Sequence, residues 1–201
     1  MPPSWASLRD KKETYDVSIP YRAAGYMTVL SFTTTPDQIM EKLREISSEA
    51  FEEAVTALDD LYQGFKPLNK FARKKKIYYE PLVFTFGELK KKLKEEKGEA
   101  FEAFYRAAYG ETAHKIASGK VNYQNGTVEL MEKVLNFADF KQPLVLLGFA
   151  PPYYPAVNSD LIPGREGAGS EIYDLVQRMS LEQFGQELVM ENYAMGISDL
   201  S

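Results

Sequence analysis

The chain has 201 residues, of which 44% are hydrophobic and 26% are charged, and this balance excludes a globally disordered chain. Its net charge of −5 argues against an obligate nucleic-acid binder, because such proteins usually carry a basic surplus. Cysteine is absent and His114 is the single histidine, so thiol catalysis is excluded and histidine-based catalysis would depend on one residue.

The N-terminal part predicts an extended segment followed by a strand. Residues 1–21 contain Pro2, Pro3 and Pro20, which oppose a helix, so we expect an extended lead-in. Residues 22–33 are rich in β-branched and aromatic side chains, a composition typical of a mostly buried strand.

A long amphipathic helix is predicted to begin after Thr35. The Thr35 side chain can cap the first free N–H groups, Pro36 suits the first helical position, and Gln38 completes a capping box. Apolar residues then recur every three or four positions and form one stripe on a solvated helix that ends near Gly64. The stripe consists of Ile39, Leu43, Ile46, Ala50, Ala54, Leu58 and Leu61.

The middle of the chain predicts an edge strand and then a block of helices. Residues 77–84 have strand composition, and Pro81 places this strand at an edge or a bulge. Residues 85–142 form the helical block. It comprises a lysine-rich helix from the capping box at Thr85 to Lys97, a second helix over about 99–109, a turn at 122–126, and a helix capped by Thr127.

The C-terminal part predicts strand, loop, helix and strand. Residues 143–150 are the most apolar run and suggest a central strand. A loop at 158–169 leads to a helix capped by Ser170, and 186–193 is expected to form the last strand. The inward face of the helix is predicted from Ile172, Leu175, Val176 and Met179.

Without the helical block the order is βαββαβ. This order predicts an α+β, ferredoxin-like fold, with a four-stranded antiparallel sheet and two helices on one face, and with the helical block as an insertion. No apolar run approaches the about 20 residues that a transmembrane helix requires, and the first residues lack the pattern of a signal peptide. With no cysteine, these features predict a cytoplasmic protein that makes no membrane contact.

The glycine-rich loop 164–170 is a candidate phosphate site, because it precedes a helix whose first N–H groups could hold an anion. It lacks the Gly-Lys-Ser/Thr of a P-loop, and Glu166 and Glu171 would repel an anion. A loop that ends in a helix cap is therefore the favoured interpretation.

Lysines and one arginine cluster around two tyrosines, Tyr78 and Tyr79, which could stack on bases. Lysine runs beside strands and on helix faces are usually solvated surface, and we favour that interpretation. The cluster consists of Lys70, Arg73, Lys74, Lys75, Lys76, Lys90, Lys91, Lys92 and Lys94.

His114 and Glu111 are three residues apart on one predicted helix, but two ligands do not make a metal site. Ser198 and Asp199 near the end of the chain carry no specific spacing. The residues thus give little support to catalysis by this chain alone, and we assign no catalytic, cofactor-binding or metal-binding residue.

Three stretches together resemble one family. They are Tyr15-Asp-Val with Pro20 and Arg22-Ala-Ala-Gly-Tyr and the Thr-Pro-Asp-Gln that follows, then Pro151-Pro-Tyr-Tyr-Pro-Ala-Val-Asn158, and Gly196-Ile-Ser-Asp-Leu-Ser201. They are similar to the middle of RocB-type arginine-utilisation proteins, which belong to the di-zinc aminoacylase/carboxypeptidase-type metallopeptidases. The resemblance spans nearly the whole chain.

The resemblance implies a lid or dimerisation domain over 22–195. Residues 1–21 would lead in from a catalytic domain and 196–201 would return to it. It further implies a zinc-dependent amide hydrolase of amino-acid metabolism as the parent, with zinc ligands outside this chain, and a homodimer formed through the lid. The bulky insertion at 85–142 departs from the family pattern and puts that lid-to-lid dimer in question.

Two alternatives stay open. The first is a standalone ferredoxin-like module that binds a small ligand or a protein partner. The second, weaker alternative is RNA binding through the lysine cluster with Tyr78 and Tyr79, which salt-sensitive binding would reveal.

Overall fold

The computed structural model describes residues 3–11, 21–30, 34–69, 71, 76–153 and 168–189. The chain divides into two compact units. One unit comprises Met1–Val29 and Thr34–Tyr153, and the other comprises Leu30–Thr33 and Tyr154–Ser201.

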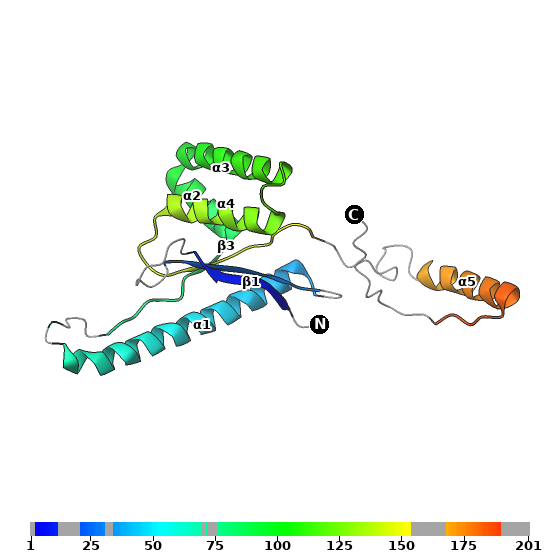
Figure 1. Ribbon diagram of the computed structural model, residues 1–201, viewed down its shortest axis with the longest axis horizontal. Coiled ribbons are helices and arrows are strands. Elements are labelled where there is room, and N and C mark those ends of the chain that lie inside the picture. The colour runs from blue at the N-terminus through cyan, green and yellow to red at the C-terminus, as the bar shows by residue number, and fades with distance from the viewer. Residues whose placement is uncertain are drawn as a thin grey trace. The chain divides into compact units, whose positions relative to one another are not determined.

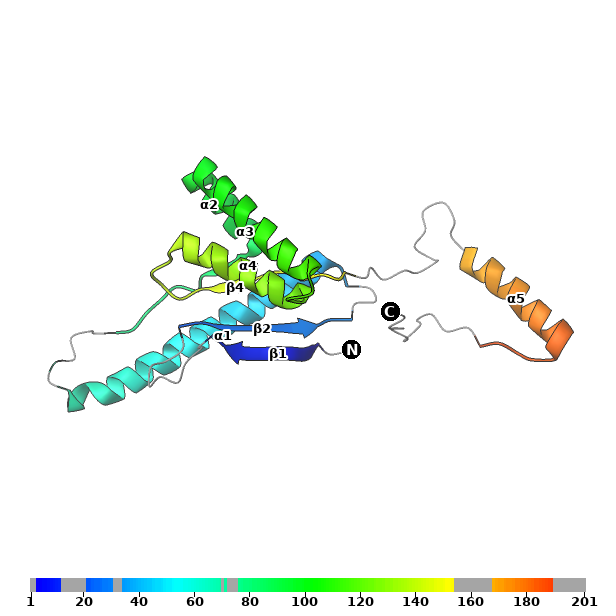
Figure 2. The same ribbon diagram turned by 45° about the horizontal axis from the view of Figure 1, so that its top comes forward.

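The first unit begins with an antiparallel hairpin of β1 (Ser4–Asp10) and β2 (Ala23–Thr28), which lie side by side in Figure 2. The register pairs Leu8 with Gly25, and a bulge interrupts it between Trp5 and Ser7. A bond from the Lys11 N–H to the Arg22 carbonyl extends the ladder at 2.9 Å. The predicted lead-in and the first predicted strand thus pair with each other.

Helix α1 (Pro36–Phe65) confirms the predicted long helix, and a short 3-10 turn, η1 (Lys66–Leu68), follows it. The Thr35 hydroxyl accepts the Gln38 N–H at 3.3 Å, and the Gln38 side chain accepts the Thr35 N–H at 2.9 Å. Both halves of the predicted capping box are present, and they satisfy two of the N–H groups that a helix leaves free.

A second, separate sheet consists of two short parallel strands, β3 (Val83–Thr85) and β4 (Val145–Leu147). Three helices connect them: α2 (Phe86–Lys97), α3 (Glu99–Ala117) and α4 (Tyr123–Ala138). Parallel strands require such a crossover, because a tight turn can join only antiparallel neighbours. Figure 1 shows the three helices gathered beside these strands.

The hydrophobic core of this unit lies among α2, α3 and α4. Leu89 and Leu93 of α2, Phe101 of α3 and Val134 of α4 are each at most 3% exposed. Aromatic rings extend the core outward, and Phe137 stacks on Phe104 with centroids 4.5 Å apart. Close aromatic pairs of this kind add to the stabilisation from buried area.

Arg44 connects α1 to the parallel sheet and to α2. Its Nη2 lies 2.6 and 2.7 Å from the two carboxylate oxygens of Glu88, and its Nη1 donates to the Val83 carbonyl at 3.3 Å. The hydrogen bond from Arg44 and the Thr85 N–H lower the pKa of Glu88 below its usual value. Glu88 therefore binds Arg44 of α1 and also completes the capping box of α2 with Thr85.

We expect Glu88→Gln to be less stable than the wild type at pH 7, by at most about 1 kcal/mol because the pair is half exposed. A carboxyl whose folded-state pKa is lowered stabilises the fold above its unfolded pKa, and that contribution is lost as the pH falls through the folded pKa. Urea unfolding between pH 7 and pH 3 should therefore show the difference between the two proteins shrinking with acidity. A difference independent of pH would contradict this role of Glu88.

In the second unit, the described residues form helix α5 (Ala168–Phe184) and the segment that follows it. The Tyr173 hydroxyl donates to the Leu188 carbonyl at 2.8 Å, and the Leu188 N–H donates to the Gln177 side chain at 2.7 Å. These two bonds hold the segment after the helix against α5.

The predicted ferredoxin-like fold is wrong. The described chain contains five α-helices and two separate two-stranded sheets, one antiparallel and one parallel, instead of a four-stranded antiparallel sheet. The strand predicted over 22–33 pairs with the preceding strand β1, and the predicted edge and central strands shorten to three residues each and pair in parallel.

Several boundaries also differ. The helix expected to end near residue 109 continues to Ala117 in α3. The turn predicted at 122–126 is the first turn of α4, because Asn122 caps the Asn125 N–H at 2.8 Å and leaves Thr127 inside the helix. Of the predicted last strand, 186–189 do not form a strand, and 190–193 lie outside the described residues.

Candidate functional site

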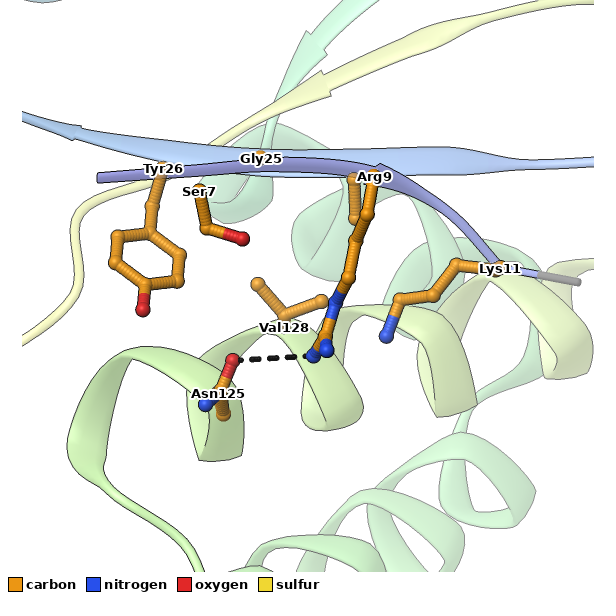
Figure 3. A pocket seen from close by; sticks show the side chains of 8 residues that line it. Ser7, Arg9, Lys11, Gly25, Tyr26, Asn125 and Val128 are labelled. Atoms are coloured by element: carbon orange, nitrogen blue, oxygen red, sulfur yellow. Dashed lines mark hydrogen bonds between the residues drawn. The ribbon is translucent and has the colours of Figure 1, made fainter. Parts of the chain in front are cut away.

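A shallow pocket forms where the β1–β2 hairpin faces helix α4 (Figure 3). It is a surface depression that is open to solvent and encloses no space of its own, so a group bound here would lie on the surface and stay in contact with water. Its lining consists of Ser7, Arg9, Lys11, Ala24, Gly25 and Tyr26 of the hairpin segment and Asn125 and Val128 of α4.

The polar side chains reach the pocket because strand residues two apart point to the same side. Ser7, Arg9 and Lys11 follow this spacing after the bulge, and Figure 3 shows their side chains on the α4 side of the hairpin. The Tyr26 hydroxyl from the paired strand lies on that side as well. All four side chains can donate hydrogen bonds, so the pocket suits a ligand that accepts them.

The pocket carries more positive than negative charge. The Lys11 ammonium lies 3.2 Å from the Glu132 carboxylate, and the Arg22 guanidinium donates to the Glu132 backbone carbonyl at 3.4 Å. Arg9 donates to the Asn125 side-chain oxygen at 3.4 Å, and no ion pair of Arg9 is found among the described residues. Among the described residues, the Arg9 guanidinium is thus seen to bind only a neutral amide, at a long distance.

Helix α4 adds to this positive potential. Asn125 belongs to its first turn, and that turn contains no acidic residue. The N-terminal end of a helix carries a partial positive charge that favours anions nearby. The guanidinium of Arg9 and this helix end therefore favour the same class of ligand, an anion such as a carboxylate or a phosphate.

Only part of the predicted lysine cluster belongs to the described residues, because Lys70 and residues 72–75 lie outside them. On α2, Lys94 pairs with Glu102 at 2.6 Å, and Lys90 lies over the Tyr105 ring at 4.9 Å. Tyr78 is exposed, with Lys76 at 6.0 Å from its ring centre. Lys90, Lys92 and Lys94 thus have partners on α2 or α3, and among the described residues no contact joins them to Tyr78 or Tyr79.

Glu111 and His114 do not form a metal site with other residues of the described part of the chain. The Glu111 carboxylate lies 2.8 Å from Lys133 and 3.4 Å from Lys115, and hydrogen bonds from these two lysines lower its pKa. Among the described residues, no three His, Cys, Asp or Glu side chains lie close enough to hold a metal ion. These residues therefore do not fit the zinc expected for the parent protein, and no zinc chemistry is assigned to them.

The other candidates fall mostly outside the described chain. Residues 164–167 of the glycine-rich loop are not described, and neither are Ser198 and Asp199. Ser170 lies inside α5, which already begins at Ala168. The pocket beside α4 was not predicted from the sequence. The alternation of the polar residues Ser7, Arg9 and Lys11 is the one signal in the sequence that points to it.

Comparison with known proteins gives one informative similarity. The chain is 26% identical to the uncharacterized protein YqjN of Bacillus subtilis (strain 168) over 200 residues. The match covers 100% of this chain and 34% of YqjN, so the chain spans about a third of the length of that relative. No family model matches the chain, and no solved structure matches it. In the described part of the chain, no helix has the length and apolar character needed to span a membrane.

Proposed function

We propose that this chain is the lid segment of a longer, metal-dependent amide hydrolase of amino-acid metabolism, and that the pocket beside α4 binds the carboxylate of its substrate. The stretches that resemble RocB-type proteins support the hydrolase class. The match to a third of YqjN supports a longer protein around the segment. The observation that carries the pocket assignment is Arg9, a guanidinium without a carboxylate partner among the described residues.

The proposed role of the lid is to bind the substrate carboxylate and to enclose the reaction site. A guanidinium binds a carboxylate through two parallel hydrogen bonds, which orient the substrate as well as attract it. The Tyr26 hydroxyl lines the same pocket and can add a donor, whereas Lys11 is already paired with Glu132. Closure of a lid over a reaction site excludes water and holds the substrate in one orientation. Zinc ions bound elsewhere in such a hydrolase would activate the attacking water.

The test uses the full-length protein with zinc and two substrates, an N-acyl amino acid with a free carboxylate and the same compound as its carboxamide. We expect Arg9→Ala to raise KM for the free acid about 10- to 100-fold, because a charged hydrogen-bonded contact contributes about 1.5–3 kcal/mol. KM for the carboxamide and kcat for both substrates should change little. Arg9→Lys, which keeps the charge but not the two-pronged geometry, should recover part of the loss.

The matched control is Arg106→Ala, which removes an exposed arginine of α3 that does not line the pocket. It should leave both substrates unaffected. Equal effects of Arg9→Ala on the two substrates would contradict the carboxylate role. A full-length protein that binds zinc but hydrolyses neither substrate would contradict this choice of amide hydrolase.

A further inference from the structure

Helix α1 exposes an apolar stripe along most of its length. The stripe, called the α1 stripe here, consists of Ile46, Ala50, Ala54, Leu58, Leu61 and Phe65. Their spacing of three or four residues places them on one side of the helix, over about 28 Å. The large members are well exposed: Leu61 to 73%, and Ile46, Leu58 and Phe65 to about half.

The stripe is not the side on which α1 packs within its unit. Phe51 is 8% exposed and Val55 is half-buried, and they lie on the neighbouring side of the helix. Towards the N-terminal end, Arg44 ties the helix to β3 and α2. In both ribbon views the C-terminal part of α1 extends past the hairpin (Figures 1 and 2). An exposed row of large apolar side chains marks an interaction surface more often than a monomer's free surface.

One edge of the α1 stripe is acidic. Glu49, Glu53 and Asp60 are spaced four and seven residues apart, so they form one row beside the stripe, and all three are exposed. None of them takes part in an ion pair among the described residues. The basic residues of α1, Lys42 and Arg44, are already paired with Glu45 and Glu88.

This charge pattern indicates which kind of partner can cover the α1 stripe. Two copies of α1 packed antiparallel about a two-fold axis would bring like edges together, and the acidic rows would repel each other. A parallel pair would instead set each acidic row against the side of the partner helix on which Phe51 and Val55 already pack within their own unit. The homodimer implied by the resemblance is therefore not assigned to this surface. An anionic membrane surface is disfavoured for the same reason. A helix whose apolar face is bordered by lysine or arginine would cover the stripe and pair with the acidic row.

We propose that the α1 stripe binds such a basic amphipathic helix, and that the helix belongs to the part of the full-length protein that this chain does not span. The assignment of this helix to the same protein rests on the proposed function, in which the chain is a segment of a longer protein. A protein organised like YqjN has about two-thirds of its length outside the matched segment. The proposal is independent of the hydrolase activity and of Arg9.

The first experiment places the photo-cross-linking residue p-benzoylphenylalanine at Leu61 in the full-length protein as encoded in its source. We expect a cross-link within one chain, which peptide mapping assigns to a lysine- or arginine-flanked helix outside these 201 residues. The same residue placed at Glu52, which is exposed on another side of α1, is the matched control and should give no such product. A cross-linked dimer, a cross-link to a segment without basic flanks, or no cross-link would overturn the proposal.

The second experiment measures binding of two synthetic helical peptides to the purified chain. They share one apolar stripe and differ only in flanking residues, lysine in one and glutamate in the other. We expect the lysine peptide to bind at least ten-fold more tightly, with the ratio falling as salt rises. Leu61→Asp should weaken that binding at least ten-fold while the circular dichroism of the chain is unchanged. Equal binding of the two peptides would overturn the proposal, and Arg9→Ala should have no effect here.

Discussion

Replacing Leu89 by alanine is expected to lower the free energy of unfolding by about 3 kcal/mol, because burial is lost and a cavity is left. Leu89 is 0% exposed and belongs to the core formed with Leu93, Phe101 and Val134. Helices α2, α3 and α4 all contribute to that core or pack on it, so no single helix can move to close the gap. Urea unfolding followed by circular dichroism at 222 nm measures the loss.

Leu61→Ala removes the same atoms from a side chain that is 73% exposed, and it provides the matched control. Alanine is also the best helix former, so the control should change the unfolding free energy by less than about 0.5 kcal/mol. If the two variants unfolded at the same urea concentration, the three-helix core would not be what stabilises this unit.

The features that the sequence predicted correctly are local ones. Both capping boxes, Thr35 with Gln38 and Thr85 with Glu88, were predicted and are present. A capping box depends on residues three apart and on backbone that is already close, so it does not depend on the rest of the fold. The lysine-rich helix ends at Lys97, as its composition predicted.

The features that failed depend on pairing between distant segments. Strand composition identified 22–33 and 143–150 as strands but contained no information about their neighbours. Ala23–Thr28 pairs with the strand that immediately precedes it in the chain, while β4 pairs in parallel with β3 across three helices. A βαββαβ order fits several pairings, and the choice among them rests on packing that periodicity does not encode.

The exposure of the α1 stripe and the formation of the pocket beside α4 also depend on contacts between distant segments. The sequence predicted one apolar stripe on the solvated helix α1, and the structure shows that from Ile46 onward this stripe is exposed, while Phe51 and Val55 take the inner position. The pocket joins Arg9 to Asn125, which are 116 residues apart in the chain. Arg9 could be recognised as a member of a polar alternation, but its companion on α4 could not.

Gly25→Ala is expected to destabilise the hairpin by about 2 kcal/mol, within the range found for overpacked sites. A Cβ at this position would lie 2.7 Å from the Ser7 carbonyl oxygen and 3.0 Å from side-chain atoms of Trp5 and Leu8. The side chains can rotate away, but the carbonyl is part of the paired strand and can move only by opening the ladder. Hydrogen exchange should therefore show faster exchange of the β1 and β2 amides, and Ser7 and Arg9 should lose their places in the pocket.

Gly64→Ala is the matched control, because no atom lies within 4 Å of its added Cβ on α1, and removing a helical glycine stabilises by about 0.5–1 kcal/mol. The same change of one methyl group should thus have opposite signs at the two positions. If Gly25→Ala proved as stable as the wild type, the close pairing that shapes the pocket would be refuted.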